Sequence, residues 1–251
     1  FYLLLKEKMR MKKKMILLTM LFSPILLFGQ IWSYPVRPGT EVWNNLKTEK
    51  ERIEAMQIPV DILNKMSTDD IIYACINFPL FGYYSAFNSP QEGFNIMFMK
   101  FNIFSKLCEK KDLVKKLIPI YKNAGLDGWI DKKNSLDNKY WTLKFSYLEY
   151  FLGQNEILVN MTEEEKIELT NLAIIKYEEK KLNESYNSIS GISSSLFLLT
   201  KIMNTNEKMK HSLLQIDCSE IIRTGLITRL EDINKILNYA NNFIKILSHD
   251  M

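Results

Sequence analysis

Helix-start signals recur along this chain and constrain its fold more than any other feature. In a capping box, a Ser or Thr side chain accepts a hydrogen bond from a backbone N–H at the start of a helix, and a Glu three residues later reaches back to the cap. The sequence holds four such pairs: Thr48 with Glu51, Ser89 with Glu92, Thr162 with Glu165, and Thr228 with Glu231. Pro90 favours the second start further, because a proline at the first helical position loses no hydrogen bond. The chain is therefore expected to be built from helices.

Apolar residues between these starts recur at helical spacing. The pattern predicts helices near 41–56, 60–66, 68–77, 90–110, 112–124, 136–152, 163–182, 188–204, 207–223 and 229–247. The helix over 90–110 is apolar around its whole circumference, which is typical of a buried helix at the centre of a core. The helix over 229–247 has one apolar face and should cover the core from outside.

The sequence gives no indication of strands, because no stretch longer than about four residues alternates cleanly and no hairpin turn joins two β-branched runs. The sequence also lacks a repeat of about 34 to 47 residues, which would indicate a regular helical solenoid. The predicted fold class is all-α: an irregular multi-helix bundle of about ten helices, preceded by a signal peptide.

The first 29 residues have the pattern of an export signal. Lys12, Lys13 and Lys14 precede an uncharged apolar run, Met15 to Phe28, which is shorter than the roughly 18 residues of a membrane-spanning helix. Cleavage is expected near Gly29, and a retained anchor is the less favoured alternative. Residues 1–29 are thus read as upstream residues and signal peptide, and 30–251 as a single helical domain with an extended arm at 30–40. The predicted location is exported, either periplasmic or secreted.

Charge argues against nucleic acid as a partner. The whole chain has a net charge of +4, but six basic residues and one acidic residue lie within the first 29 positions. The rest carries 27 basic and 28 acidic residues. Because binding to a phosphate backbone needs concentrated positive charge, we expect no nucleic-acid partner. No Cys follows the apolar run to accept a lipid, so no stable membrane anchor is expected after signal cleavage.

Candidate catalytic and metal-binding groups all have simpler interpretations. Cys75, Cys108 and Cys218 fit no disulfide framework or metal knuckle, so buried thiols are favoured, and one disulfide with one free Cys is the alternative. His211 lies four residues after Glu207, which is typical of a surface ion pair. No catalytic residue, metal site or cofactor is predicted.

Carboxylate pairs could in principle cleave a glycosidic bond. Asp69 with Asp70 and Asp127 with Asp131 are such pairs. However, Asp69 and Asp70 follow Ser67 and Thr68, where acids stabilise a helix N-terminus.

One segment is harder to explain by packing alone. Residues 77–94, NFPLFGYYSAFNSPQEGF, concentrate aromatic side chains among prolines and glycines. They form either a plug over the core or a ligand-binding surface. The candidate ligand-binding residues are Phe81, Tyr83, Tyr84 and Phe87, joined by Trp32, Tyr34 and Arg37 of the arm.

This segment and the stretches WSYPVRPGTEVW and LKTEKERIEAMQIP resemble an uncharacterised family of exported proteins from gut Gram-negative bacteria. The resemblance covers about residues 32–130. It implies an exported helical protein, and no known activity or catalytic residue comes with it.

The sequence therefore favours an exported, non-enzymatic helical binding or scaffold module of the bacterial envelope or exterior, with an unknown protein or small ligand as partner. The alternative is a hydrolase acting on envelope or dietary polymer. A cleft lined by two carboxylates about 5 to 10 Å apart would favour the hydrolase. An exposed aromatic patch would favour the binding module.

Overall fold

The computed structural model describes residues 32–126, 138–186, 188–215 and 218–250, so the predicted signal peptide lies outside the described residues. Residues 32–251 form one compact unit. Its helical elements are α2 Glu41–Asn45, α3 Glu49–Ala55, α4 Val60–Leu63, α5 Thr68–Ile76, the 3-10 helix η1 Phe81–Ala86, α6 Pro90–Lys100, α7 Asn102–Cys108, α8 Leu113–Asn123, α9 Asn138–Leu152, α10 Asn155–Leu158, α11 Glu163–Lys181, α12 Ile189–Met203, α13 Glu207–Gln215, α14 Ser219–Thr224 and α15 Glu231–Asp250. The described residues contain no strand, which confirms the all-α prediction.

Three of the long predicted helices are each divided in two. The segment 41–56 becomes α2 and α3, 90–110 becomes α6 and α7, and 207–223 becomes α13 and α14. The break between α6 and α7 lies at Phe101, whose backbone is extended (φ −118°, ψ 120°). There the Asn102 backbone N–H donates to the Gln57 side chain at 3.0 Å, and the Asn102 side chain donates to the Ile58 carbonyl at 2.8 Å. Hydrogen bonds to a distant segment thus replace those that would continue the helix.

The predicted capping boxes form to different extents. Thr48 and Thr162 form complete capping boxes with Glu51 and Glu165. Ser89 accepts from the Glu92 backbone N–H, but the Glu92 side chain accepts from Asn88 instead of returning to the cap. The prediction of the fourth box, Thr228 with Glu231, is wrong, because α15 begins only at Glu231, three residues after Thr228.

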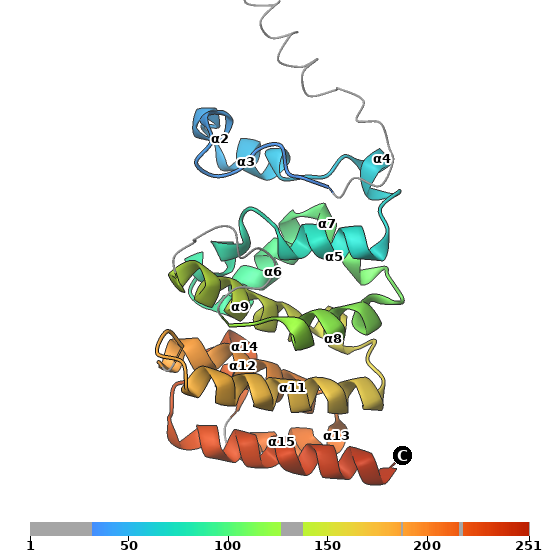
Figure 1. Ribbon diagram of the computed structural model, residues 1–251, viewed down its shortest axis with the longest axis vertical. Coiled ribbons are helices and arrows are strands. Elements are labelled where there is room, and N and C mark those ends of the chain that lie inside the picture. Colours follow the sequence, from blue (N-terminus) through green and yellow to red (C-terminus); the bar gives the residue numbers. More distant parts are fainter. Residues whose placement is uncertain (1–31, 127–137, 187, 216–217, 251) are drawn as a thin grey trace, which may run out of the picture. The chain divides into compact units, whose positions relative to one another are not determined.

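Helix α12 lies at the centre of the core. Every residue from Gly191 to Met203 is buried, and α12 packs against α9, α11, α14 and α15. Figure 1 shows the layer of α11 and α12 between that of α8 and α9 and that of α13 and α15. The small Ser193–Ser195 let neighbouring helices approach closely, and the larger Leu196–Leu199 fill the space beyond. The expectation that the 90–110 helix is buried all round is wrong, because Met99 in α6 is 80% exposed.

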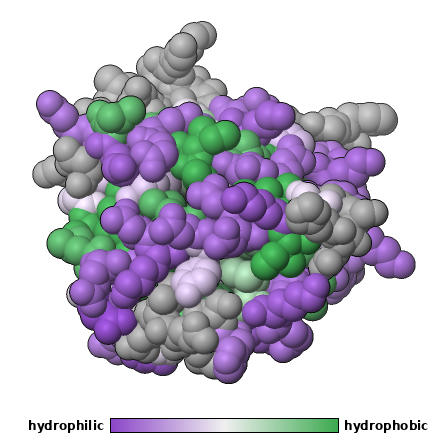
Figure 2. Space-filling model, turned by 90° about the horizontal axis from the view of Figure 1, so that it is seen from below, coloured by the Kyte–Doolittle hydropathy of each residue, from purple (hydrophilic) through white to green (hydrophobic). Residues whose placement is uncertain are grey.

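Helix α15 covers one side of this core, as its sequence pattern predicted. Ile233, Ile236, Ala240, Phe243 and Leu247 are buried, and α15 packs on α11 and α12. Figure 2 shows the molecule from this side, where hydrophilic residues predominate and the hydrophobic ones are scattered among them. The outer face of α15 is therefore mainly solvated.

Two substitutions in α6 test its placement. Phe94→Ala should lower the free energy of unfolding by about 3 to 5 kcal/mol, because Phe94 is fully buried and its loss leaves a cavity. Met99→Ala, on the exposed face of the same helix, should change it by less than about 0.5 kcal/mol. Urea unfolding measures both, and equal effects would contradict the orientation of α6.

Candidate functional site

A fully buried ionic network joins four helices. Its centre is Glu149 of α9, which is 0% exposed, as is its partner Lys180 of α11. The Glu149 Oε1 atom accepts hydrogen bonds from Tyr121 of α8 and from Ser195 of α12, both at 2.8 Å. The Oε2 atom pairs with the Lys180 ammonium and accepts from Ser194 of α12 at 2.6 Å. The carboxylate thus has four donors from three neighbouring helices.

The surroundings of Lys180 are polar on one side and aromatic on the other. Its Nζ atom also donates to the Ser194 hydroxyl at 2.9 Å, and it lies 5.0 Å from the ring centroid of Phe145 and 5.6 Å from that of Tyr186. Burial lowers the pKa of Lys180, and the adjacent Glu149 charge opposes this change. Burial and the same negative charge raise the pKa of Tyr121. A buried charge is tolerated when it is paired and hydrogen-bonded, and both charges of this network are.

A serine hydroxyl beside a lysine is an arrangement that some hydrolases use as nucleophile and base. Here Ser194 is fully buried, and its hydroxyl donates to Glu149 while it accepts from Lys180. The geometry therefore assigns these groups to holding α9, α11 and α12 in register. This network was not predicted from the sequence, although one signal for it is present: Glu149 is the only charged residue in the largely apolar stretch FSYLEYFL.

Substitutions at the ion pair should show strong coupling. Lys180→Met should lower the free energy of unfolding by about 3 to 5 kcal/mol, because the Glu149 carboxylate stays buried without a counter-charge. Adding Glu149→Gln should recover part of that loss, since a neutral amide needs no counter-charge. Urea unfolding of both single variants and the double variant measures the coupling.

The exposed pair of Lys210 and Glu207 provides the matched control. Their side chains are 42% and 83% exposed, so Lys210→Met should change stability by less than about 1 kcal/mol. Strictly additive effects of Lys180→Met and Glu149→Gln would show that the buried pair is not coupled.

In the aromatic segment, residues 77–94, one of the four candidate rings lies in the core and three are half-buried. Tyr84 is 3% exposed, and its hydroxyl donates to the Leu143 carbonyl at 3.3 Å. Phe81, Tyr83 and Phe87 are half-buried, and the rings of Tyr83 and Phe87 meet edge to face at 4.9 Å. Tyr84 is therefore a packing residue, as the plug interpretation expected for this segment.

Gly93 fixes how closely the segment approaches α6. A Cβ atom at this position would lie 2.2 Å from the Tyr84 carbonyl oxygen. Only a residue without a side chain allows this contact, so Gly93 holds the Tyr84 backbone directly against the first turn of α6.

The arm residues also differ in their placement. Tyr34 is 4% exposed, and its ring meets that of Phe78 edge to face at 5.5 Å. Trp32 is half-buried with its ring 6.0 Å from that of Tyr34, whereas Arg37 is exposed. Tyr34 therefore belongs to the core like Tyr84, and of the seven candidate residues the other five keep solvent-accessible surface.

The structure adds residues of α9 to the surroundings of Phe81. The Phe81 ring lies 5.1 Å from that of Tyr140, which is 5.5 Å from that of Trp141. Burial raises the pKa of Tyr140, and the positive charge of Arg37 opposes this change. Tyr140 and Trp141 both lie in the helix predicted over 136–152, but they were not among the predicted site residues. Tyr140 and Lys144, four residues apart on one helix face, were the signal for this cluster.

Lys144 is buried against these rings. Its Nζ atom donates to the Asn77 side chain at 2.8 Å and lies 6.0 Å and 5.9 Å from the ring centroids of Tyr140 and Trp141. Burial lowers the pKa of Lys144 to about 8. Its ammonium thus loses its proton at a lower pH in the folded protein than in the unfolded chain.

This pKa predicts a pH-dependent stability. Between about pH 8 and pH 10.5 the unfolded chain holds the Lys144 proton that the folded protein has released, so the free energy of unfolding should rise with pH across this window. The change is on the order of a few kcal/mol, at about 1.4 kcal/mol per pKa unit. Urea unfolding of the wild type and Lys144→Met at pH 7 to 10.5 isolates this contribution. A difference between the two that stays constant with pH would contradict it.

Asp69 and Asp70 lie in the first turn of α5, where the helix-start interpretation put them. Asp70 completes a capping box with Ser67, and Asp69 pairs with Lys116 at 2.5 Å. Asp127 and Asp131 lie outside the described residues. Glu207 pairs with Lys210, and the side chain of His211 is exposed.

No disulfide joins Cys75, Cys108 and Cys218. Cys75 and Cys218 are buried and Cys108 is half-buried, in keeping with the favoured interpretation of the thiols. Burial raises the pKa of the Cys108 thiol to about 11 and raises that of Cys75 strongly. Since the thiolate is the reactive form, these two thiols are poor nucleophiles near neutral pH.

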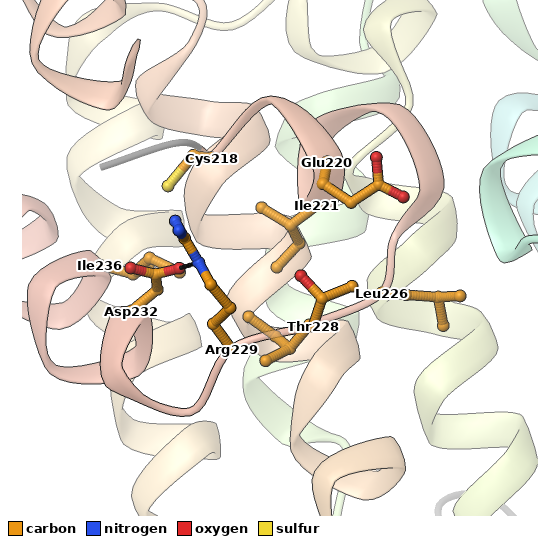
Figure 3. Close-up of a pocket in the computed structure, with 9 residues that line it drawn as sticks. Cys218, Glu220, Ile221, Leu226, Thr228, Arg229, Asp232 and Ile236 are labelled. Carbon is orange, nitrogen blue, oxygen red and sulfur yellow. Dashed lines mark hydrogen bonds and ion pairs between the residues drawn. The ribbon is translucent and has the colours of Figure 1, made fainter. Parts of the chain in front are cut away.

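A small hollow lies between α14 and the start of α15 (Figure 3). Figure 3 shows the Arg229 side chain extended between Cys218 and Asp232, with the Glu220 carboxylate directed away from it. The Arg229 Nε atom donates to Asp232 at 2.8 Å, and Lys235 approaches the other carboxylate oxygen at 3.3 Å. The hollow comprises about 230 Å³ of space, part of which is open to solvent.

Comparison with models of known families, with characterised proteins and with solved structures finds no match to this chain. Within the described ranges, no three His, Cys, Asp or Glu residues form a group that could hold a metal ion. No helix in that part of the chain is long and apolar enough to cross a membrane.

Proposed function

We propose that the protein is an exported, non-enzymatic helical binding or scaffold module of the bacterial envelope or exterior. It contacts a protein partner or small ligand through Phe81, Tyr83 and Phe87, joined by Trp32 and Arg37 of the arm. The observation that carries this proposal is the presence of three half-buried rings in one segment, η1 and the residue after it.

The way this segment is held supports a binding role. Tyr84 fixes its centre in the core through its ring and its hydrogen bond to Leu143, and Gly93 brings its backbone against α6. The neighbouring rings are thus positioned before a partner arrives, so less conformational entropy is lost on binding. Aromatic rings also supply large contact areas with few rotatable bonds, which is why they dominate many interfaces.

Export is supported by the sequence. The basic residues Lys12–Lys14 and the apolar run after them form a signal-peptide pattern. The resemblance to exported proteins of gut Gram-negative bacteria agrees with this origin. In the predicted mature chain the arm is the N-terminus, next to the aromatic segment.

The test uses the protein secreted by a Gram-negative host. The intact mass of the exported product should correspond to a chain that begins near Gln30. As immobilised bait it should retain a partner from envelope and culture extracts, and Phe81→Ala and Phe87→Ala should each reduce retention at least about tenfold through lost aromatic contact.

The control is Tyr73→Ala, which removes a partly exposed ring from α5, outside the aromatic segment. It should leave retention unchanged, and the melting temperatures of the three variants should stay within a few degrees of wild type. Equal retention by all variants would overturn the binding surface. A product retained in the membrane with its N-terminus intact would overturn the export step.

A further inference from the structure

The residues from Trp32 to Ala55 form a peripheral strap, which consists of the arm, α2 and α3. Neither α2 nor α3 contains a buried residue. The arm buries only Tyr34 and Val36. The strap therefore covers the body of the protein while contributing little to its core.

The polar contacts of the strap are almost all internal. Arg37 donates to the Tyr34 carbonyl and to Ser33, and Thr40 donates to the Arg37 carbonyl. Among the described residues, Glu49 is the only strap residue that hydrogen-bonds to residues after Ile58. It pairs with Lys100 at 2.5 Å and accepts a hydrogen bond from Tyr83 at 3.4 Å. Glu49 is 64% exposed, and exposed ion pairs contribute little to stability.

The buried face of the arm carries two polar atoms without partners. The Trp32 indole nitrogen and the Tyr34 hydroxyl are both buried without a hydrogen-bond partner. Such atoms lose their bonds to water on docking and gain nothing in return, which weakens the docked state. The contacts of the arm with the body are therefore apolar and partly offset by this loss.

The three residues after the strap, Met56–Ile58, form an anchor that is held firmly in the body of the protein. Met56 and Ile58 are fully buried. Between them the Gln57 side chain donates to the Lys100 carbonyl at 2.8 Å and accepts from the Asn102 backbone. The chain thus changes within a few residues from a loosely tied strap to a segment fixed by hydrogen bonds in the core.

We propose that the strap opens as a unit from this anchor while the rest of the protein stays folded, and that opening uncovers Phe78 and Tyr83. Phe78 is fully buried and packs on the Tyr34 ring, and Tyr83 donates a hydrogen bond to Glu49 of α3. The role of opening, to control access to the aromatic segment, rests on the proposed binding function. The opening itself is measured without any partner.

The test places a thiol under the strap. In the full mature chain, Val36→Cys introduces a buried thiol in the arm, and Ala173→Cys introduces one in α11 of the body. Each variant is treated with N-ethylmaleimide in increasing sub-denaturing urea, and peptide mass spectrometry separates the new thiols from the three native ones. Cys at position 36 should react at least about tenfold faster than Cys at position 173, with a weaker dependence on urea, as expected for local opening.

Two further changes in the Val36→Cys protein test the cause. Tyr34→Phe removes the unpartnered hydroxyl and should slow labelling about five- to tenfold. Glu49→Gln removes the tie to Lys100 and should speed labelling about two- to fivefold. Labelling at position 36 with the same rate and urea dependence as at position 173 would overturn the proposal, and so would an unchanged rate in Tyr34→Phe. Neither result would bear on whether the aromatic segment binds a partner.

Discussion

The buried pair of Glu149 and Lys180 is the interaction on which the arrangement of the central helices depends. An ion pair taken out of water recovers its desolvation cost only with good geometry and with hydrogen bonds to its remaining polar atoms. Glu149 meets this requirement through hydroxyls from α8 and α12 in addition to the ammonium from α11. A shift of any of these helices along its axis would remove at least one donor. The network therefore acts mainly by selecting one register among the many that apolar packing alone would tolerate.

This requirement also explains the composition of α12. A helix enclosed on all sides would ordinarily be apolar throughout, yet α12 carries Ser193, Ser194 and Ser195 near its start. Two of these serines donate to Glu149, and Ser193 donates to the Ile189 carbonyl within the helix. Their small size allows α9 and α11 to approach closely enough for the pair to meet. The polar start of α12 and the apolar stretch Leu196–Leu199 after it thus perform different tasks in one helix.

Local signals in the sequence predicted most of the helices but not the contacts between them. The boxes at Thr48 and Thr162 depend on residues three positions apart, so sequence reasoning could identify them. The break at Phe101 depends on Gln57 and Asn102, which are 45 residues apart, and no local pattern could reveal it. The candidate site divides in the same way. An aromatic-rich segment is visible in the sequence, but which of its rings is buried depends on Leu143 and Phe94, which pack on Tyr84 from other helices.

The treatment of buried polar groups distinguishes the body of the protein from its N-terminal strap. In the body, Glu149 pairs with Lys180 and accepts from three hydroxyls, and Tyr147 donates its hydroxyl to the Cys75 carbonyl at 2.8 Å. Gln91 and Glu163 of the body each have one buried oxygen without a partner, but the other polar atom of each side chain is hydrogen-bonded. In the strap, the hydroxyl of Tyr34 is buried without a partner. A tyrosine at this position keeps the docked arm weaker than phenylalanine would, since both rings make the same apolar contacts and only tyrosine loses a bond to water. The sequence thus combines a body whose polar groups specify one packing with a cover whose polar group disfavours permanent closure, and that combination suits a protein in which the surface near Phe78 and Tyr83 is covered at some times and open at others.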